Sequence, residues 1–308
     1  MIDGLVNVYK EKGYTSHDVV AVMRGIFGQK RIGHTGTLDP DATGVLPILL
    51  GSATKLSDMM PDDTKTYRAT LLLGVETNTQ DITGEVISKK DVNVSETVVR
   101  ETISSFVGTI SQLPPMYSAI KVNGKKLVDL AREGIVVERK KRDIQIFDIK
   151  IEDISLPEVV MTVDCSKGTY IRTLCHDIGE KLGTHGCMKD LVRTRAGCFH
   201  IGQALKIEQI QSLKDSGELS RIVARTDMPL EIYGAVFCKS IADRLCANGN
   251  KIPRDMLDID RNADGRKAMH TASKCPDEHY LRLYDSTGRF VGLYANDKKG
   301  MLKPIKIF

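Results

Sequence analysis

The sequence predicts an α+β protein of two domains, a larger one at residues 1–229 and a small β domain at residues 230–308. The chain has 308 residues, whereas single hydrophobic cores usually stop growing at about 250 to 300 residues. Apolar residues with strand and helix periods alternate through the first part of the chain. Beyond Thr226, short apolar runs are separated by Gly, Asn and Pro turns, a spacing typical of a small β-barrel.

The first thirty residues predict a strand followed by a helix. GLVNVYK at residues 4–10 has the composition of a strand. Ser16 is expected to cap the helix, because apolar residues then recur at helical spacing. They are Val19, Val22, Met23 and Ile26. This helix is predicted to contribute to the core.

The segment GHTGTLDPDATG at residues 33–44 suits neither a helix nor a strand, because three glycines and a proline interrupt both periods. Asp39 precedes Pro40, whose ring disfavours helical backbone at the preceding residue, so we expect this carboxylate on an extended segment. The apolar residues at 45–50 are expected to anchor the loop in the core.

Two kinds of ligand-binding loop are excluded by position. No lysine follows Gly36 or Gly44, as a GxxxxGK[ST] phosphate loop requires. A calcium loop that begins at Asp39 would need a glutamate at its twelfth position, which is Leu50. The residues leave two interpretations of Asp39 open: a side chain that bonds an amide of its own turn, and a chemically active carboxylate.

The central part of the chain predicts strands and helices in alternation. TYRATLLLG at residues 66–74 predicts a strand with Tyr67 near its start. A helix is expected from Ser95, and DIQIFDIKIEDI at residues 143–154 alternates imperfectly, which indicates a strand with a bulge. Residues 159–174 predict a strand, a turn and the beginning of a helix.

A basic segment at residues 121–142 has eight Lys or Arg against three Asp or Glu, a net charge of +5. The whole chain carries only +4, so any affinity for nucleic acid must come from such local patches. Most charge runs are solvated surface, but a segment that follows a phosphate backbone needs the same density of charge. Its candidate phosphate contacts are Lys125, Lys126, Lys140 and Lys141.

Composition predicts a cytoplasmic protein without membrane segments. No basic stretch followed by an apolar one opens the chain, and no run of about 18 apolar residues occurs. Seven cysteines without CxxC spacing suit a reducing compartment. The closest approach to a metal cluster is Cys175, His176, His185 and Cys187. Adjacent helical residues point in different directions, so no metal site is expected there.

Four segments carry a resemblance to a known family. GHTGTLDPDATGVLPILLG resembles the catalytic-aspartate motif of the TruB family of tRNA pseudouridine synthases. Further matches follow in order: KTYRATLLLG, LPPMYSAIKVNGKKL and GTYIRTLCHDIGEKLG. The resemblance covers most of the chain and weakens beyond about residue 230, and the polar residues 254–279 match nothing in it.

The resemblance implies a pseudouridine-synthase fold, with a mixed, largely antiparallel sheet, flanking helices and a C-terminal PUA-like RNA-binding barrel. It implies that the protein isomerises one uridine in the T loop of tRNA, conventionally position 55, without cofactor or metal. The T-arm stem-loop is the expected partner, and a monomer without an obligatory protein partner is expected. The target base must leave its stack before it reacts.

The resemblance also assigns residues. Asp39 is the expected catalytic acid, acting as nucleophile or base, and the sequence leaves that choice open. Tyr67 is expected to stack on the target base. Tyr170 and Arg172 are expected in the active site, with Arg172 paired to Asp39 and keeping it ionised.

Further expected contacts surround that centre. Leu191 is expected to form an apolar wall of the uracil pocket, and Arg193 to face RNA. His34 is a candidate for a residue that stacks or wedges where the flipped nucleotide leaves. The basic segment at residues 121–142 resembles the insertion with which the family grips the RNA loop, which favours a functional interpretation of its lysines.

Two other classes of function stay open. A non-catalytic tRNA-binding or tRNA-folding factor would use the basic segment and the C-terminal domain but would not need Asp39. A catalytic subunit of a guide-RNA-dependent synthase would share the motif and rely on protein partners. The short C-terminal domain lacks a long basic tail, which favours the stand-alone enzyme.

Overall fold

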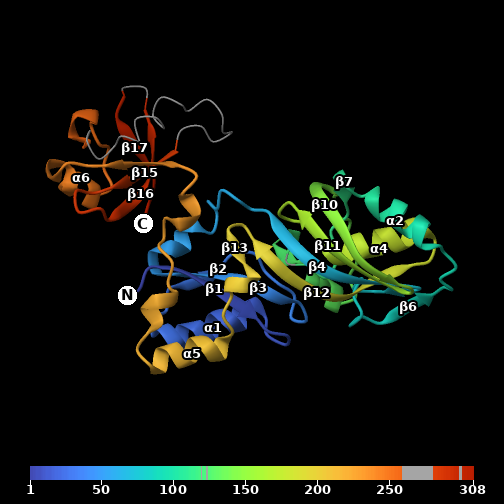
Figure 1. Cartoon of the computed structure of the whole chain (residues 1–308). Helices are drawn as coiled ribbons and strands as arrows, with labels where there is room; N and C mark the ends of the chain where they lie inside the picture. Colours follow the sequence, from blue (N-terminus) through green and yellow to red (C-terminus); the bar gives the residue numbers. More distant parts are fainter. Residues whose placement is uncertain (119, 123, 259–279, 298–299) are drawn as a thin grey trace.

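The computed structural model describes residues 1–118, 120–122, 124–258, 280–297 and 300–308. Two sheets dominate it, a nine-stranded sheet in the larger N-terminal part and a four-stranded sheet near the C-terminus. In Figure 1 the small sheet lies above the end of the large sheet that carries β1 and β2, away from α2. The predicted α+β class is confirmed.

The large sheet has the strand order β1-β3-β12-β4-β11-β10-β7, with β2 added to β3 and β13 to β12. Only the β3–β12 pair is parallel among its described pairs, so the sheet is mixed and largely antiparallel, as expected. Its strands are β1 Gly4–Lys10, β2 Ile32–His34, β3 Thr43–Leu50, β4 Lys65–Leu73, β7 Gly108–Gln112, β10 Arg142–Ser155, β11 Glu158–Cys165, β12 Gly186–Ala196 and β13 Phe199–His200.

Helices cover the sheet in two groups. They are α1 Ser16–Phe27, α2 Glu96–Ser104, α4 Ile171–Leu182 and α5 Ile207–Asp215. The apolar face of α1 packs with α5 against β1 and β3, whereas α2 and α4 pack against the central strands β4, β10 and β11. The N-cap of α2 is Ser95, as predicted.

The cap of α1 differs from the prediction. Thr15 is the N-cap, and its side chain accepts a hydrogen bond from the amide of Asp18, whose carboxylate accepts one from the amide of Thr15. Ser16 is the first helical residue. Its hydroxyl is used elsewhere: it accepts a hydrogen bond from the amide of Leu38 at 2.9 Å and lies 3.3 Å from the carbonyl oxygen of Leu38. Ser16 therefore ties α1 to the loop that carries Asp39.

The strands predicted in the centre of the chain are confirmed. Tyr67, Ala69, Leu71 and Leu73 of β4 are all buried on one face. The long strand β10 shows irregular register against β11 between Ile146 and Asp148, as its imperfect alternation predicted.

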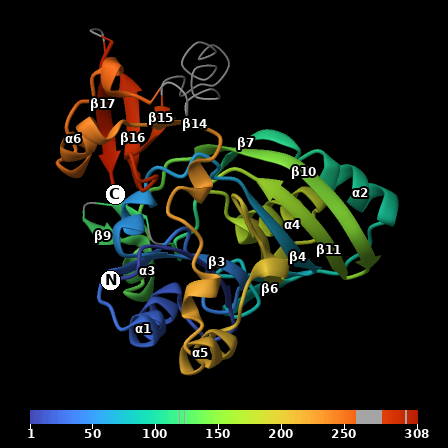
Figure 2. The same ribbon diagram turned by 60° about the vertical axis from the view of Figure 1, so that its left-hand side comes forward.

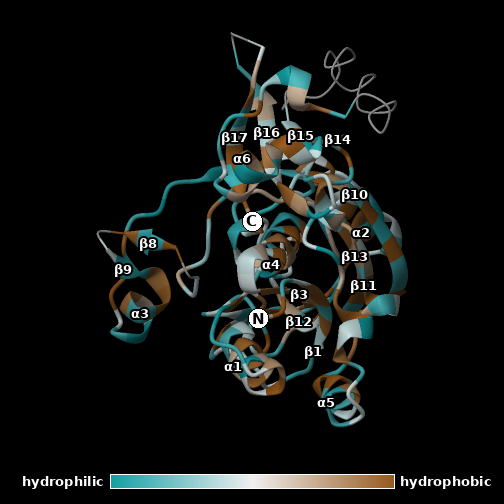
Figure 3. Cartoon of the chain, turned by 90° about the vertical axis from the view of Figure 1, so that its left-hand side faces the viewer, coloured by the Kyte–Doolittle hydropathy of each residue, from teal (hydrophilic) through white to brown (hydrophobic). Residues whose placement is uncertain are grey.

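The basic segment forms a small excursion from the large sheet, seen beside α1 in Figure 3. It contains β8 Lys121–Val122, β9 Lys125–Lys126 and α3 Leu127–Arg132, which buries Leu127 and Leu130. Within this segment, Asn123 lies outside the described residues. A second hairpin joins β5 Val75–Thr77 to β6 Val86–Lys89.

The C-terminal part forms a sheet of β14 Gly234–Phe237, β15 Tyr280–Tyr284, β16 Phe290–Asn296 and β17 Leu302–Ile307, with the short helix α6 Asp243–Ala247 beside it (Figure 2). Among the described residues no pairing joins β14 to β17, so the expected PUA-like barrel is seen only as a small open sheet. Of the unmatched polar stretch at residues 254–279, residues 259–279 lie outside the described residues.

The two parts share one hydrophobic cluster. Leu293 of β16 and Leu230 pack with Leu5, Leu49 and other residues of the large domain. The ammonium of Lys55 also donates a hydrogen bond to the carbonyl oxygen of Ile307 at 2.6 Å. The domain boundary predicted near residue 229 therefore falls within a packed region.

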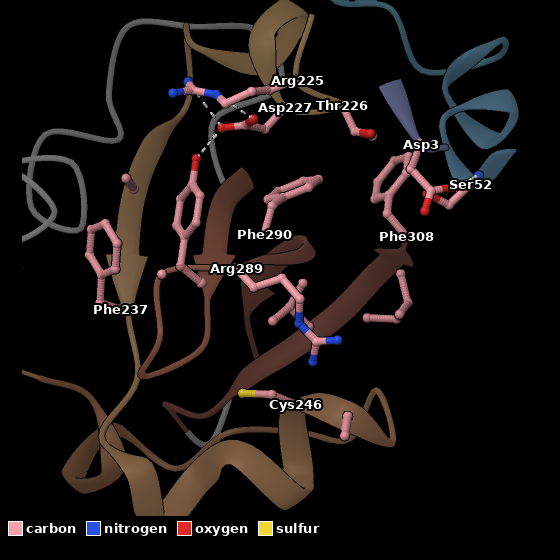
Figure 4. A pocket seen from close by; sticks show the side chains of 16 residues that line it. Asp3, Ser52, Arg225, Thr226, Asp227, Phe237, Cys246, Arg289, Phe290 and Phe308 are labelled. Atoms are coloured by element: carbon pink, nitrogen blue, oxygen red, sulfur yellow. Dashed lines mark hydrogen bonds and ion pairs between the residues drawn. The ribbon is translucent and has the colours of Figure 1, made fainter. Parts of the chain in front are cut away.

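A cavity of about 730 Å³ lies along this junction. Figure 4 shows Asp3 and Ser52 of the large domain beside Phe308. On the opposite side, the carboxylate of Asp227 accepts hydrogen bonds from Arg225 and from the hydroxyl of Tyr284. Among the described residues, no helix has the length and apolar character needed to cross a bilayer.

Candidate active site

The loop that carries Asp39 is fixed on several sides. Two antiparallel strands, β2 and β3, hold its ends, with His34 opposite Ile48. The ammonium of Lys10, which has no exposed surface, donates a hydrogen bond to the carbonyl oxygen of Pro40 at 2.9 Å. Burial lowers the pKa of Lys10 to about 8. Sequence reasoning missed Lys10, which sits in a strand and gives no local signal of this contact.

Asp39 forms an ion pair with Arg172. The Nη2 atom of Arg172 lies 3.2 Å from Oδ1 and 3.0 Å from Oδ2 of Asp39. Within the described residues, no backbone amide donates to this carboxylate, whereas the backbone carbonyl of Asp39 accepts from the amide of Ala42. The interpretation of Asp39 as a side chain that bonds its own turn is therefore wrong.

Arg172 is buried and links three groups. Besides Asp39, its Nη2 atom donates to the carbonyl oxygen of Tyr117 at 2.8 Å, and its Nη1 atom lies 3.5 Å from Oδ2 of Asp81. Asp81 also accepts hydrogen bonds from Thr79 and Thr83, so its carboxylate is fixed in its own turn. Sequence reasoning missed the contact between Asp81 and Arg172, which joins residues far apart in the chain.

Burial raises the pKa of Asp39, and the positive charge of Arg172 opposes this effect without overcoming it. The Asp39 side chain is 44% exposed, but it lies in a recess where the surrounding protein replaces much of the water around the carboxylate. The expected ion pair is present. Burial outweighs it, however, so the pKa of Asp39 is raised on balance, and the carboxylate is a stronger base than that of an ordinary aspartate.

One cavity of about 330 Å³ brings together the predicted catalytic and substrate-binding residues except His34, and its volume is at the lower end of small-molecule sites. It is lined by Asp39, Tyr67, Tyr170, Arg172, Leu191 and Arg193, among others. A neighbouring cavity of about 250 Å³ shares Asp39, Arg172 and Leu191, and continues to Asp81 and Arg132.

Besides the Asp39 loop, three elements supply these side chains. Tyr67 comes from β4, and Arg193 lies directly opposite it on β12. Tyr170 is the N-cap of α4, and its backbone is held on both sides by the buried side chain of Gln112. Since Arg172 lies in the first turn of α4, the bonds to Gln112 also fix the start of the helix from which Arg172 reaches Asp39.

Tyr67 and Leu191 give the cavity apolar surface. Tyr67 is 9% exposed and Leu191 is 7% exposed. Burial raises the pKa of Tyr67, so its hydroxyl stays neutral and the ring offers an uncharged π-surface.

Arg193 lies inside the protein, which corrects the expectation that it faces RNA. It is 1% exposed, and its guanidinium donates to the carbonyl oxygens of Val45 at 2.7 Å and Gly36 at 2.9 Å. A Cβ atom at Gly36 would lie 3.2 Å from this guanidinium, and Gly36 has a φ of +69°. Arg193 thus holds the Asp39 loop against β12, and glycine permits the close approach.

His34 is not among the residues that line either cavity at Asp39. Its ring packs edge-on against His17 with 5.5 Å between the centroids. Burial, and secondarily the charge of His17, lower the pKa of His34 to about 4, so the ring is neutral near pH 7. The predicted stacking role of His34 has no support in this geometry and stays a prediction.

The four candidate phosphate contacts of the basic segment, Lys125, Lys126, Lys140 and Lys141, are exposed, and we call them the insertion lysines. Of the four residues that came closest to a metal cluster in the sequence, Cys175 and Cys187 are fully buried in the protein interior.

Two family models match the chain, and together they cover residues 24–231. A family model described as the N-terminal domain of TruB family pseudouridylate synthases matches residues 24–171. A second, described as the C-terminal domain of tRNA pseudouridylate synthase B, matches residues 172–231.

Similar proteins extend over the whole chain. A tRNA pseudouridine synthase B from Lachnoclostridium phytofermentans is 43% identical to this chain over 316 residues, and the match covers 100% of both chains. Another from Alkaliphilus oremlandii is 47% identical over 256 residues, which are 83% of this chain and 85% of the relative. A third from Clostridium acetobutylicum is 40% identical over 99% of both chains.

Solved structures share the fold. A chain from "Structure of H/ACA RNP bound to a substrate RNA containing 2'-deoxyuridine" superposes with a TM-score of 0.69 at 22% identity, over 99% of this chain and 84% of that chain. A chain from "Crystal Structure of a Cbf5-Nop10-Gar1 Complex" gives 0.69 at 23% identity over the same shares. On the matches to both family models and the full-length relatives, the chain belongs to the TruB family of tRNA pseudouridine synthases.

Proposed function

We propose that this protein isomerises one uridine in the T loop of tRNA, conventionally position 55, to pseudouridine, with Asp39 as its catalytic carboxylate. The observation that carries the proposal is the cavity of about 330 Å³ in which one acid, two tyrosines and an apolar wall converge. The relatives at 40–47% identity carry the name tRNA pseudouridine synthase B, which supports tRNA as the substrate.

The cavity suits a base that has left its stack. A flipped pyrimidine loses its neighbours, and the ring of Tyr67 offers a replacement surface. Leu191, from the neighbouring strand, provides apolar contact from within the same cavity. Together they would exclude water from the glycosidic bond while it is broken.

The reaction is an isomerisation, so its atoms and electrons balance without an oxidant or reductant. The bond between N1 and C1′ breaks, the freed uracil rotates, and C5 bonds to C1′. The proton on C5 is lost, and N1 ends protonated.

Two roles of Asp39 fit this reaction. It acts as a nucleophile on the sugar or base, or as a base at the 2′ position, and both roles need the ionised carboxylate. Arg172 holds the carboxylate in place through contacts to both of its oxygens. The tie between Arg172 and Asp81 fixes Arg172 in turn.

The basic segment would grip the RNA around this cavity. Val128 and Arg132 of α3 line the neighbouring cavity beside Asp39, so the segment reaches the site itself. The insertion lysines are exposed on the same segment and would contact phosphates.

The test uses the purified chain alone with an unmodified T-arm stem-loop. We expect complete conversion of one uridine in the T loop, measured by release of tritium from C5-labelled uridine. Conversion only after addition of a guide RNA and protein partners would assign the chain to the guide-dependent class. Tight binding without any conversion would make it a tRNA-binding factor.

A further inference from the structure

Two histidines and two glutamates converge at the C-terminal end of α4, outside both cavities at Asp39. The Nδ1 atom of His185 lies 2.5 Å from Oε1 of Glu180 and 3.7 Å from Oε2 of Glu76. The other oxygen of Glu76 lies 3.7 Å from Nε2 of His176. Glu76 therefore stands between the two imidazoles.

Local structure explains why these side chains meet. His176 and Glu180 are four residues apart in α4 and share one face of the helix. The helix ends at Gly183 in the left-handed conformation, and His185 itself has a φ of +62°, so the chain turns back sharply. The amide of Gly74 donates to the carbonyl oxygen of His185 at 3.2 Å, which brings the start of β5 beside this turn.

The spacing of the ligand atoms suits a small divalent metal ion. Nδ1 of His185 and one oxygen each of Glu76 and Glu180 all lie within 4.8 Å of one another. Zinc bonds of about 2.0–2.2 Å in a tetrahedral site place the donor atoms roughly 3.3–3.6 Å apart. The 3.7 Å separation of His185 and Glu76 is close to this spacing. The contact between His185 and Glu180 must lengthen, and the Glu180 side chain is 44% exposed and can move.

The charge of the cluster also favours a cation. Glu76, Glu180 and the neighbouring Asp177 carry three carboxylates, and within the described part of the chain their only ion-pair partners are the two imidazoles. Lys90 acts on Glu180 only as a weaker, more distant charge. Half-buried carboxylates without a lysine or arginine partner are stabilised when a metal ion neutralises them.

We propose that His185, Glu76 and Glu180 bind one zinc ion, with a water molecule as the fourth ligand. The metal replaces the proton on Nδ1 of His185, which passes to solvent, and each glutamate supplies one oxygen. The role is structural. The site joins β5 to α4. Arg172 lies in the first turn of α4, and the chain after β5 leads into the turn of Asp81, which contacts Arg172. The bound ion would therefore stabilise the two elements that position Arg172 at the Asp39 cavity.

The experiment uses the full-length, untagged protein after treatment with chelator. Titration with Co²⁺ as a spectroscopic probe should give the visible absorption of a four-coordinate ion, saturate at one equivalent, and disappear when Zn²⁺ is added. The melting temperature should rise with Zn²⁺ concentration, because an ion that binds only the folded state stabilises it.

Variants decide whether these residues are the ligands. Glu180→Gln replaces an exposed carboxylate by an amide, and His185→Asn keeps a residue type that tolerates positive φ. Removal of a residue that only hydrogen-bonds to a metal ligand lowers metal affinity about 10- to 100-fold. Removal of a ligand itself should therefore lower the affinity for Zn²⁺ by at least about tenfold. The control Glu208→Gln removes an exposed glutamate of α5 and should bind as the wild type does.

Two results would overturn the proposal: no saturable binding by the wild type, or wild-type affinity in Glu180→Gln. The result for Glu180→Gln decides the question even if His185→Asn does not fold, because the Glu180 side chain is 44% exposed and its substitution leaves no buried gap. Binding that weakens equally in Glu208→Gln would show general attraction of cations to acidic surface and would also reject the site.

Discussion

Replacing Arg172 by glutamine tests how the carboxylate of Asp39 is held. Glutamine is neutral and shorter, so it loses the contact to Asp39, the bond to the carbonyl oxygen of Tyr117 and the ion pair with Asp81. The two carboxylates then face each other without a cation between them. The pKa of Asp39, already raised by burial, should rise further because the opposing charge of Arg172 is gone.

The magnitude follows from these contacts. A hydrogen bond between charged groups contributes about 1.5–3 kcal/mol, and the partial exposure of Asp39 places its pair at the lower end, about 1.5 kcal/mol. With about 1 kcal/mol for the bond to the Tyr117 carbonyl, we expect a loss of unfolding free energy of roughly 2.5 kcal/mol. If the full 1.5 kcal/mol serves to position the acid, the single-turnover rate should fall about tenfold.

Urea unfolding and single-turnover kinetics across pH measure both quantities. The matched control is Arg195→Gln on β12, which loses a 2.7 Å ion pair with Asp164 but touches neither Asp39 nor Asp81. It should lose a comparable amount of stability and keep its rate. If Arg172→Gln retains both the wild-type rate and the wild-type acidic limb of its pH profile, Arg172 does not act on Asp39.

Three further results are expected. Alanine at all four insertion lysines should weaken tRNA binding and flatten the dependence of log affinity on log salt, since each lost phosphate contact removes about one counterion; an unchanged slope would identify the segment as solvated surface. Deletion of residues 230–308 should leave a folded protein with a lower melting temperature, because it uncovers the cluster shared with Leu293; an unchanged melting temperature would refute that packing. The rate of the wild type should fall as the pH is lowered, with a midpoint above the ordinary aspartate pKa of about 3.9, because burial raises the pKa of Asp39 and protonation removes the reactive carboxylate. A rate that stays constant down to about pH 3.9 would argue against a carboxylate mechanism.

Local patterns predicted much of the fold. The segment TYRATLLLG predicted the strand β4 with Tyr67 near its start, and the irregular pattern of β10 indicated its bulge. The cap of α1 was missed by one residue because Thr15 and Ser16 are adjacent and both are good N-caps. The hydroxyl of Ser16 instead accepts a hydrogen bond from the amide of Leu38 in the Asp39 loop, a contact that the local sequence does not show.

Site residues that belong to a local sequence motif could be predicted, whereas contacts between strands far apart in the chain could not. Asp39, Tyr67 and Arg172 were placed from their motifs, and one cavity contains all three. Arg193 was expected at the surface because no local pattern shows that β12 pairs in parallel with β3, which places Arg193 beside Gly44 in the interior. The contact of Lys10 with Pro40 likewise depends on the fold, since it spans thirty residues.

Substitution of asparagine for Asp39 tests the central claim most directly. Asparagine preserves the shape of the side chain, and Arg172 keeps its contacts to Tyr117 and Asp81, so the unfolding free energy should change by no more than about 1 kcal/mol. The control is Asp41→Asn, two residues along the same loop, where the carboxylate is 53% exposed and lies 4.0 Å from the ammonium of Lys12.

The measurement is single-turnover pseudouridine formation on the T-arm stem-loop, with enzyme in excess and chelator present. If Asp39 is the catalytic carboxylate, Asp39→Asn should fold, bind RNA as the wild type does, and form no detectable pseudouridine, whereas Asp41→Asn should turn over near the wild-type rate. Appreciable turnover by Asp39→Asn, or an equal loss in both variants, would contradict the assignment of Asp39 as the catalytic carboxylate.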